Sequence, residues 1–266
     1  MTDALAARVF AVAEAAGALA MARFRTDVRR WEKSPGQLVC EVDIAVDQML
    51  REQLSALLPD AGWLSEETVD GAERLAGRRV WVVDPIDGTR DYLRGRPGWA
   101  VSIALVEDGQ PVIGVLAAPA RGECWTAIAG GGAWRNGKPV RAGDRSELAG
   151  ARVPADALAR ADRDFVTVAK PNSIALRMAM VAAGEADLLA TLRWGHEWDI
   201  AAAVLIAREG GAAVSDALGR PLSFNTRRGE AFGILVTAPG IHAAAVERLR
   251  ERAQAGHARA RDGQAG

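Results

Sequence analysis

The sequence predicts a layered α+β fold with two halves, one built from antiparallel strands and one from alternating strands and helices. Short apolar runs in the first half follow one another closely across the turns Asp108-Gly109 and Arg121-Gly122, and such short connections favour antiparallel pairing. From about residue 150 onward strand and helix patterns alternate, which is typical of a sheet covered by helices. The 266 residues, 49% of them apolar, are enough to form a large core without disulfides or structural zinc.

The first half, residues 1–149, is predicted to begin with two helices. Apolar residues recur at helical spacing through 2–25, and a second helix is expected over 43–58 after a turn at 34–36. Strands are expected over 63–67, 79–84, 99–106, 112–118 and 123–129, the second of these ending at Asp84-Pro85. The glycines at 130–132 and the pair Asn136-Gly137 indicate hairpin turns, because no Lys-Ser/Thr follows them as in a phosphate-binding loop.

The second half, residues 150–252, shows the alternating pattern. Strands are expected near 165–169, 186–191, 212–215 and 233–237, and helices over 173–183, 199–208 and 241–252. The remaining residues, 253–266, are polar and rich in Ala, Gly and Arg, so they are predicted to form a disordered tail.

The charge balance and the cysteines exclude several functions. The 33 basic and 34 acidic side chains give a net charge of −1, so no positive field exists that would attract a nucleic-acid polymer. A small phosphorylated partner stays possible, because a few local cations are enough to bind it. The two cysteines, Cys40 and Cys124, match no zinc or redox spacing and are interpreted as buried apolar residues of a protein in a reducing compartment.

The N-terminal segment is rich in alanine but carries Asp3, Arg8 and Glu14, which interrupt any signal-peptide core. No segment reaches the roughly 18 uninterrupted apolar residues of a membrane span. The protein is therefore expected to be cytoplasmic and to have no membrane partner.

Four carboxylates lie where the chain leaves regular structure. Asp84 and Asp87 follow an apolar strand, Glu66 ends the preceding strand, and Asp199 stands at the predicted start of a helix. Each has an ordinary explanation, since Pro-Ile-Asp-Gly is a common surface turn, Glu is mostly exposed, and Asp often caps helices. Together they form a set of oxygen ligands of the kind that Mg²⁺ prefers, and several anionic oxygens are needed to hold two ions during phosphoryl transfer.

Gly88 and Thr89 directly follow this acidic run. A glycine turn that leads into a helix presents backbone N–H groups, which can hold a substrate phosphate. The hydroxyl of Thr89 could also orient a water molecule if a second carboxylate accepted its proton. From these residues alone, a metal-dependent phosphate site and a simple surface turn both stay open.

Three segments resemble the motifs of the inositol monophosphatase superfamily, which contains lithium-sensitive, magnesium-dependent phosphatases. They are Leu64-Ser65-Glu66-Glu67, then Trp81-Val82-Val83-Asp84-Pro85-Ile86-Asp87-Gly88-Thr89, and finally Trp198-Asp199-Ile200-Ala201-Ala202-Ala203 with Glu209-Gly210-Gly211. Their order and spacing agree with the family, and the resemblance extends from about residue 5 to residue 250. It implies an α/β/α/β/α sandwich with an N-terminal antiparallel sheet and a smaller C-terminal sheet.

The resemblance implies that two or three Mg²⁺ ions are bound by Glu66, Asp84, the carbonyl of Ile86, Asp87 and Asp199. Asp43, Thr89 and Glu66 would be catalytic, with Thr89 and Asp43 activating the attacking water. Asp43 falls in the segment where the family has V-T-x-A-D, and here Cys40 replaces the threonine. No cysteine or serine lies where a covalent nucleophile is expected, so hydrolysis by a metal-activated water is predicted.

The residues after the central motif bear on the substrate. Thr89-Arg90-Asp91-Tyr92 resembles the T-[KR]-E-F of 3'(2'),5'-bisphosphate nucleotidases more than the T-T-N-F of inositol phosphatases. Leu192 stands where inositol phosphatases carry a glutamate that binds ring hydroxyls. We therefore favour hydrolysis of adenosine 3',5'-bisphosphate to AMP and phosphate. The expected substrate-binding residues are Asp87, Gly88, Thr89, Lys170, Ser173, Arg193 and His196, with Lys170, Arg193 or His196 holding the second anionic group.

Two alternatives stay open. One is an inositol-1-monophosphatase or a broad sugar-phosphate phosphatase of the same fold. The other, of a different class, is a non-catalytic relative that binds metal and phosphate for regulation, although the intact set of motif residues argues against it. A homodimer is possible, since the family resemblance implies both monomers and dimers.

Overall fold

The computed structural model describes residues 2–34 and 36–262. The α-helices in these ranges are α1 (Thr2–Arg23), α2 (Glu41–Leu57), α3 (Thr89–Leu93), α4 (Ile174–Ala182), α5 (Ala201–Glu209) and α6 (His242–Asp262). The strands are β1 (Arg30–Ser34), β2 (Gln37–Cys40), β3 (Gly62–Ser65), β4 (Arg79–Asp87), β5 (Ala100–Glu107), β6 (Gln110–Ala118), β7 (Glu123–Ile128), β8 (Gly132–Arg135), β9 (Lys138–Pro139), β10 (Arg152–Pro154), β11 (Val166–Val168), β12 (Leu188–His196), β13 (Ala213–Ser215) and β14 (Glu230–Thr237).

Most strands belong to two sheets. The larger sheet has the order β3-β4-β5-β6-β7-β8-β9, and the smaller has the order β12-β14-β13. Neighbours pair antiparallel in both sheets, except that β3 runs parallel to β4. The expected N-terminal antiparallel sheet and smaller C-terminal sheet are therefore present, with one parallel pair that the sequence did not indicate. β1 and β2 form a separate hairpin, and β10 and β11 a short parallel pair.

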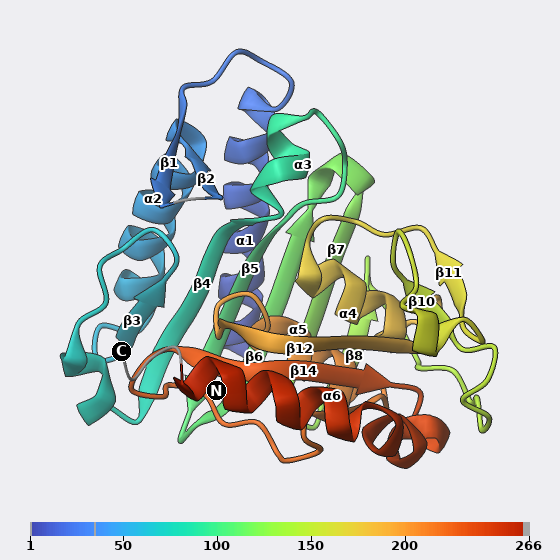
Figure 1. Ribbon diagram of the computed structural model, residues 1–266. Helices are drawn as coiled ribbons and strands as arrows, with labels where there is room; N and C mark the ends of the chain where they lie inside the picture. The colour runs from blue at the N-terminus through green and yellow to red at the C-terminus, as the bar shows by residue number, and fades with distance from the viewer. Residues whose placement is uncertain (1, 35, 263–266) are drawn as a thin grey trace.

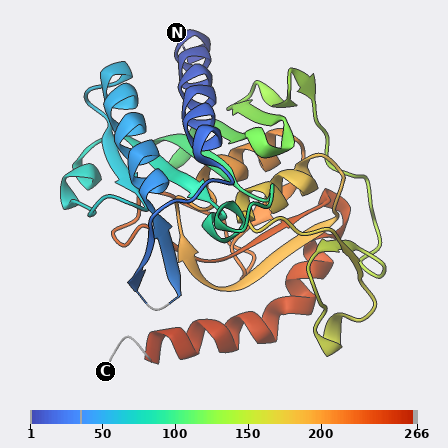
Figure 2. The ribbon, with the colours of Figure 1, turned by 90° about the horizontal axis from the view of Figure 1, so that it is seen from above.

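Helices and sheets alternate in five layers. Figures 1 and 2 show α1 and α2 on one face of the large sheet, α4 and α5 between the two sheets, and α6 on the outer face of the small sheet. Along β4, Val80 and Val82 point into the core shared with α4 and α5, whereas Trp81 and Val83 point into the core beneath α1 and α2. Because both faces of the large sheet are covered, its central strands are apolar throughout. The α/β/α/β/α sandwich is confirmed.

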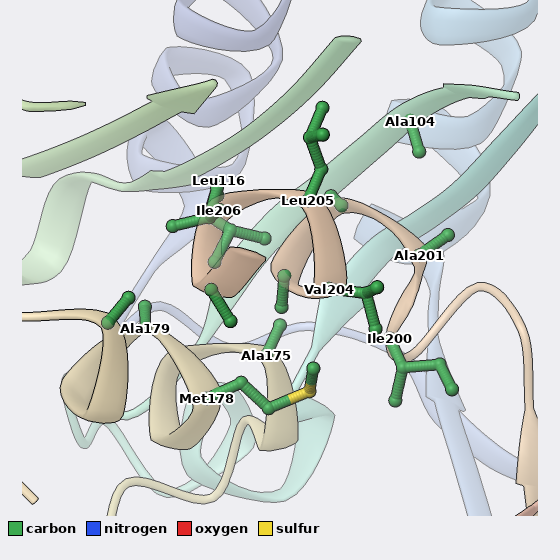
Figure 3. Packing of buried hydrophobic residues seen from close by; sticks show 14 of the residues in the cluster. Ala104, Leu116, Ala175, Met178, Ala179, Ile200, Ala201, Val204, Leu205 and Ile206 are labelled. Carbon is green, nitrogen blue, oxygen red and sulfur yellow. The ribbon is translucent and has the colours of Figure 1, made fainter. Parts of the chain in front are cut away.

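The central helical layer joins the two sheets. α5 is buried on every side from Ala201 to Ala207, as expected for a helix that is apolar all round. Figure 3 shows Ala175 and Ala179 of α4 on the side that faces α5, where small side chains let the two helices pack closely. β6 also approaches α5, since a Cβ at Gly114 would lie 2.9 Å from the carbonyl oxygen of Ala202. Residues before and after position 150 therefore contribute to one core.

Several elements differ in extent from those expected from the sequence. β4 continues through Pro85 to Asp87, because a bulge keeps the chain paired with β5. β12 continues to His196 along β14, so Arg193 and His196 lie on a strand rather than on a loop. α2 begins at Glu41, and β1 and β2 form a hairpin around the expected turn at 34–36, of which residue 35 lies outside the described ranges.

The segment 253–262 is helical rather than disordered, because α6 continues as far as Asp262. Ala253 is fully buried in a small cluster with Ala217 and Phe232. This segment has few apolar residues of its own, so its order depends on contact with the small sheet rather than on a hydrophobic pattern. Residues 263–266 of the predicted tail lie outside the described part of the chain.

α1 is long and apolar enough to span a membrane by length and composition, with a mean hydropathy of 1.6 over Asp3–Arg23. In this fold its buried side chains, among them Val9, Ala13 and Ala20, belong to the core between α1, α2 and the large sheet. A core helix of a globular protein passes the same test, so the finding is weak support for a membrane segment. The expected cytoplasmic location stays a prediction.

Candidate metal and phosphate site

A β-bulge at the end of β4 brings two aspartates to one side. Asp84 lies opposite Ser102 of β5 and Asp87 opposite Ala100, so β4 has one residue more than its partner between these pairs. Residues three apart on a regular strand point to opposite faces, and the extra residue cancels that alternation. Side-chain oxygens of Asp84, Asp87 and Asp199 consequently lie within 4.8 Å of one another. Three of the four carboxylates that the sequence indicated thus form an acidic cluster. Among the described residues Glu66 is not part of this group, but it lies near enough for its charge to raise the pKa of Asp84.

The carboxylates of this cluster repel one another in a buried site. Burial raises the pKa of Glu66 to about 8. The positive charge of Lys33 opposes this rise, and the negative charge of Asp199 adds to it. Burial and the charge of Asp87 raise the pKa of Asp199 to about 7, and burial raises the pKa of Asp84 well above its usual range. Uncompensated buried charge is costly, and a hard divalent cation with oxygen ligands would remove that cost. The donor set therefore fits Mg²⁺ or a similar ion.

Divalent cations are expected to raise the unfolding temperature more at about pH 8 than at about pH 5.5. The raised pKa values of Glu66 and Asp199 mean that the folded, metal-free protein binds protons more tightly than the unfolded chain. Its stability therefore falls as the pH rises from the ordinary carboxyl pKa of about 4 toward 8, whereas metal affinity rises because the ligands lose their protons. Calorimetry with and without Mg²⁺ at the two pH values measures the difference. Equal shifts at both would show that these carboxylates do not bind the ion.

Asp87 is held at the N-terminus of α4. The hydroxyl of Ser173 and the backbone N–H of Ala175 both donate hydrogen bonds to Asp87 Oδ2, the second at 2.8 Å. Ser173 also caps α4, because its oxygen accepts a hydrogen bond of 2.9 Å from the backbone N–H of Leu176. The expectation that Ser173 contacts the substrate is not met, since its side chain is fully buried and orients Asp87 instead.

Thr89 lies beside Asp43 at the start of α3. Its hydroxyl oxygen is 3.1 Å from the carbonyl oxygen of Ile86 and 3.4 Å from Asp43 Oδ1. The other carboxylate oxygen of Asp43 accepts a hydrogen bond of 2.8 Å from the backbone N–H of Cys40. Cys40 is the N-cap of α2 and Asp43 its third residue, so the cysteine takes the capping position without displacing the aspartate. The hydroxyl of Thr89 can therefore direct its single proton to the carbonyl oxygen of Ile86 or to Asp43, and the distance to Asp43 is the longer of the two.

Gly88 permits the sharp turn between Asp87 and Thr89. Its φ is +96°, in the left-handed region. A Cβ at this position would lie 2.7 Å from the carbonyl oxygen of Gly98 and 2.9 Å from the backbone nitrogen of Ser173, so any other residue would push the end of β4 away from α4. The turn leads directly into α3, whose first backbone N–H groups have no partner within the helix.

A cavity of about 590 Å³ opens beside the acidic cluster. It is lined by all of the expected substrate-binding residues except Ser173, namely Asp87, Gly88, Thr89, Lys170, Arg193 and His196. Lys170 forms an ion pair with Asp156. The ring of His196 stacks on Trp198, with ring centroids 4.2 Å apart, and burial lowers the pKa of this histidine. His196 is therefore neutral at physiological pH and offers a hydrogen bond rather than a charge.

Two cations near the cluster were not found by sequence analysis. Arg177 lines the cavity, and its Nε donates a hydrogen bond of 2.9 Å to the carbonyl oxygen of Pro171. Its signal was a single charge within the apolar helix 174–182. Lys33 of the β1–β2 hairpin donates a hydrogen bond of 3.2 Å to the carbonyl oxygen of Glu66 and forms an ion pair of 2.5 Å with Glu67. No sequence pattern connects Lys33 with this site, because the contact depends on how the hairpin folds back.

The five-layer sandwich carries buried carboxylates next to a cavity that is also lined by cations. This combination is typical of a metal-dependent phosphatase. A comparison with known families specifies the class further. The chain belongs to the inositol monophosphatase family, whose sequence model matches residues 2–261. Members of this family are hydrolases of phosphoric monoesters that act on small phosphorylated substrates, so the chain is a phosphatase of this kind.

Relatives of this chain carry several functional names. It is 34% identical over 209 residues to Inositol monophosphatase 2 of Solanum lycopersicum, covering 72% of this chain and 79% of the relative. It is 31% identical over 245 residues to the 3'(2'),5'-bisphosphate nucleotidase CysQ of Aggregatibacter actinomycetemcomitans, covering 85% and 90%. It is 36% identical over 203 residues to Nus factor SuhB of Xylella fastidiosa, covering 70% and 71%. These identities establish the family and do not separate its substrates.

Solved structures agree with the family assignment. The IMPase of Thermotoga maritima superposes with a TM-score of 0.79 at 28% identity, covering 91% of this chain and 95% of that structure. The extragenic suppressor protein suhB of Bartonella henselae superposes with a TM-score of 0.79 at 27% identity, covering 93% and 98%. The fold that the sequence motifs implied is confirmed.

Proposed function

We propose that the chain is a Mg²⁺-dependent 3'(2'),5'-bisphosphate nucleotidase that hydrolyses adenosine 3',5'-bisphosphate to AMP and phosphate. The charge pattern of the cavity is the observation that carries this proposal. The carboxylates of the acidic cluster and the cations Lys170, Arg177 and Arg193 line the same space. A bisphosphate needs both features, because one phosphate binds at the metal site and the other requires cations of its own.

Two further observations support a nucleotide bisphosphate over inositol 1-phosphate. The side chain of Leu192 packs near Phe232 and Ala253 in the core of the small sheet, so it offers no carboxylate to the hydroxyls of a sugar ring. Arg90 belongs to the segment that resembles the nucleotidases. It lines the cavity and donates a hydrogen bond of 3.0 Å to the carbonyl oxygen of Gly36.

In the proposed reaction two or three Mg²⁺ ions would be held by Glu66, Asp84, Asp87, Asp199 and the carbonyl of Ile86. When bound, Mg²⁺ neutralises the phosphate charge and activates water. The hydroxyl of Thr89 orients the attacking water. Asp43, which lies 3.4 Å from that hydroxyl, accepts the proton of the hydroxyl. The backbone N–H groups of Gly88 and Thr89 at the start of α3 bind the oxygens of the scissile phosphate.

The substrate is tested by measuring kcat/KM with Mg²⁺ for adenosine 3',5'-bisphosphate, inositol 1-phosphate and fructose 1,6-bisphosphate side by side. We expect the first to be preferred by about tenfold or more, equivalent to about 1.4 kcal/mol of additional binding. The resemblance also leads us to expect inhibition by millimolar Li⁺. A preference for inositol 1-phosphate would overturn the proposed substrate and leave the family assignment intact.

One other substrate class has support of its own. Several relatives are named inositol monophosphatases, which favours hydrolysis of inositol 1-phosphate or another sugar phosphate. The same assay separates the two functions, because this alternative requires that inositol 1-phosphate be turned over faster than adenosine 3',5'-bisphosphate. The non-catalytic alternative is not proposed, because the chain belongs to a family of phosphatases.

A further inference from the structure

A second β-bulge shapes the wall of the cavity. β12 bulges between Thr191 and Trp194, where two residues, Leu192 and Arg193, lie opposite Gly233 alone. A Cβ at Gly233 would lie 2.3 Å from the carbonyl oxygen of Thr191, so the bulge depends on this glycine. Bulges redirect side chains and are common next to active sites. Here the side chain of Leu192 packs into the core, and that of Arg193 is exposed at the cavity.

Arg193 is suited to bind an anion. Within residues 2–34 and 36–262 its side chain has no hydrogen bond or ion pair, whereas Lys170 is paired with Asp156. A guanidinium can bind a phosphate through two parallel hydrogen bonds. The free guanidinium therefore matches the second phosphate of a bisphosphate.

The end of α6 packs against this bulge from the outer face of the small sheet, along which Figure 2 shows α6 running. A Cβ at Gly256 would lie 2.9 Å from the carbonyl oxygen of Leu192. The ring centroid of His257 is 6.0 Å from that of Trp194 and 4.8 Å from that of Phe232. The residues on both sides of Arg193 are thus contacted by one turn of this helix.

We propose that the end of α6, residues 253–262, positions Arg193 to bind the second anionic group of the substrate and thereby sets the preference for bisphosphates over monophosphates. Gly256 and His257 are the positioning residues, and the described lining of the cavity contains neither. The inference rests on the proposed function, because it names the residues that select that substrate. The preference for bisphosphates over monophosphates would thus depend on α6, a helix that carries none of the three sequence motifs.

Gly256→Ala tests the inference, since it adds one methyl group against the carbonyl of Leu192 and places a stronger helix former in α6. The measured quantity is kcat/KM for adenosine 3',5'-bisphosphate divided by kcat/KM for p-nitrophenyl phosphate. We expect this ratio to fall about tenfold, equivalent to about 1.4 kcal/mol. Arg193→Ala should lower it at least as much, and the double variant should show no further loss, because both changes remove the same contact.

Gln254→Ala is the matched control, because Gln254 is exposed on the same helix. It should leave the ratio unchanged. If Gly256→Ala unfolds the protein, His257→Ala removes the ring contacts without adding atoms and provides the same measurement. An unchanged ratio in the helix variants, or additive losses in the double variant, would overturn the inference alone. A wild-type protein without preference for the bisphosphate would overturn the proposed function and the inference together.

Discussion

Replacing Asp84 with asparagine is expected to lower Mg²⁺-dependent turnover about a thousandfold, equivalent to about 4 kcal/mol of transition-state stabilisation. It should at the same time raise the unfolding temperature of the metal-free protein. Asp84 is 1% exposed. Its burial is the main cause that raises its pKa well above the ordinary range, and the negative charges of Glu66 and Asp87 raise this pKa further. A neutral amide of nearly the same shape removes this unfavourable charge but is a weaker ligand for a cation. Activity and stability should therefore change in opposite directions.

Both effects can be measured on one preparation, by calorimetry with a chelator at about pH 8 and by phosphate release at saturating Mg²⁺. Asp144→Asn makes the same chemical change at an exposed position and should alter neither quantity. Full turnover in Asp84→Asn would remove Asp84 from the proposed ligands. A lower unfolding temperature would contradict the conclusion that the metal-free carboxylates repel one another.

Replacing Thr89 with valine is expected to lower kcat about a hundredfold, the effect of losing one group that handles protons in the transition state. Valine has nearly the shape of threonine but lacks the hydroxyl that lies 3.4 Å from Asp43 and 3.1 Å from the carbonyl oxygen of Ile86. In the proposed reaction, the attacking water would then lose both its orientation and the route by which a proton reaches Asp43. The carboxylates of the acidic cluster are untouched, so Mg²⁺ should still bind.

Thr89→Ser is the control for this variant, because it keeps the hydroxyl and should keep most of the activity. The increase in unfolding temperature that Mg²⁺ produces should be the same in wild type, Thr89→Val and Thr89→Ser. A loss of that increase in Thr89→Val would mean that the substitution acts on metal binding. Nearly full kcat in Thr89→Val would exclude the proposed role of this hydroxyl.

The division of the fold into two parts could be predicted because it depends on local patterns, whereas the five layers were implied only by the family resemblance. Apolar strands with short turns between them led to the large sheet, and the apolar run after Asp199 led to the helix expected over 199–208. The bulge between Asp84 and Asp87 could not be predicted in this way. Pro85 indicates the end of a strand, since proline lacks a backbone N–H for the ladder, yet the bulge accommodates it and the strand continues.

The side chains that support the site were harder to predict than the acidic residues themselves. Ser173 was assigned to the substrate, although a serine directly before an apolar helix is also a signal for an N-cap, and capping α4 is what it does. The polar composition of residues 253–266 predicts a disordered tail, yet 253–262 are helical. The contacts of this segment with Trp194 and Phe232 join residues distant in sequence, and no local pattern reports such contacts.

The acidic cluster lies between the two sheets, and this affects how the protein can mature. Glu66 follows β3 and Asp84 lies within β4 of the large sheet, whereas Asp199 follows β12 of the small sheet. During synthesis the strands of the large sheet leave the ribosome before residue 199 has been made, and folding generally proceeds from the N-terminus. A partly synthesised chain therefore lacks part of the proposed set of ligands. If the cation needs carboxylates from both sheets, it would be bound only after the sheets have come together, and its uptake would mark the end of folding.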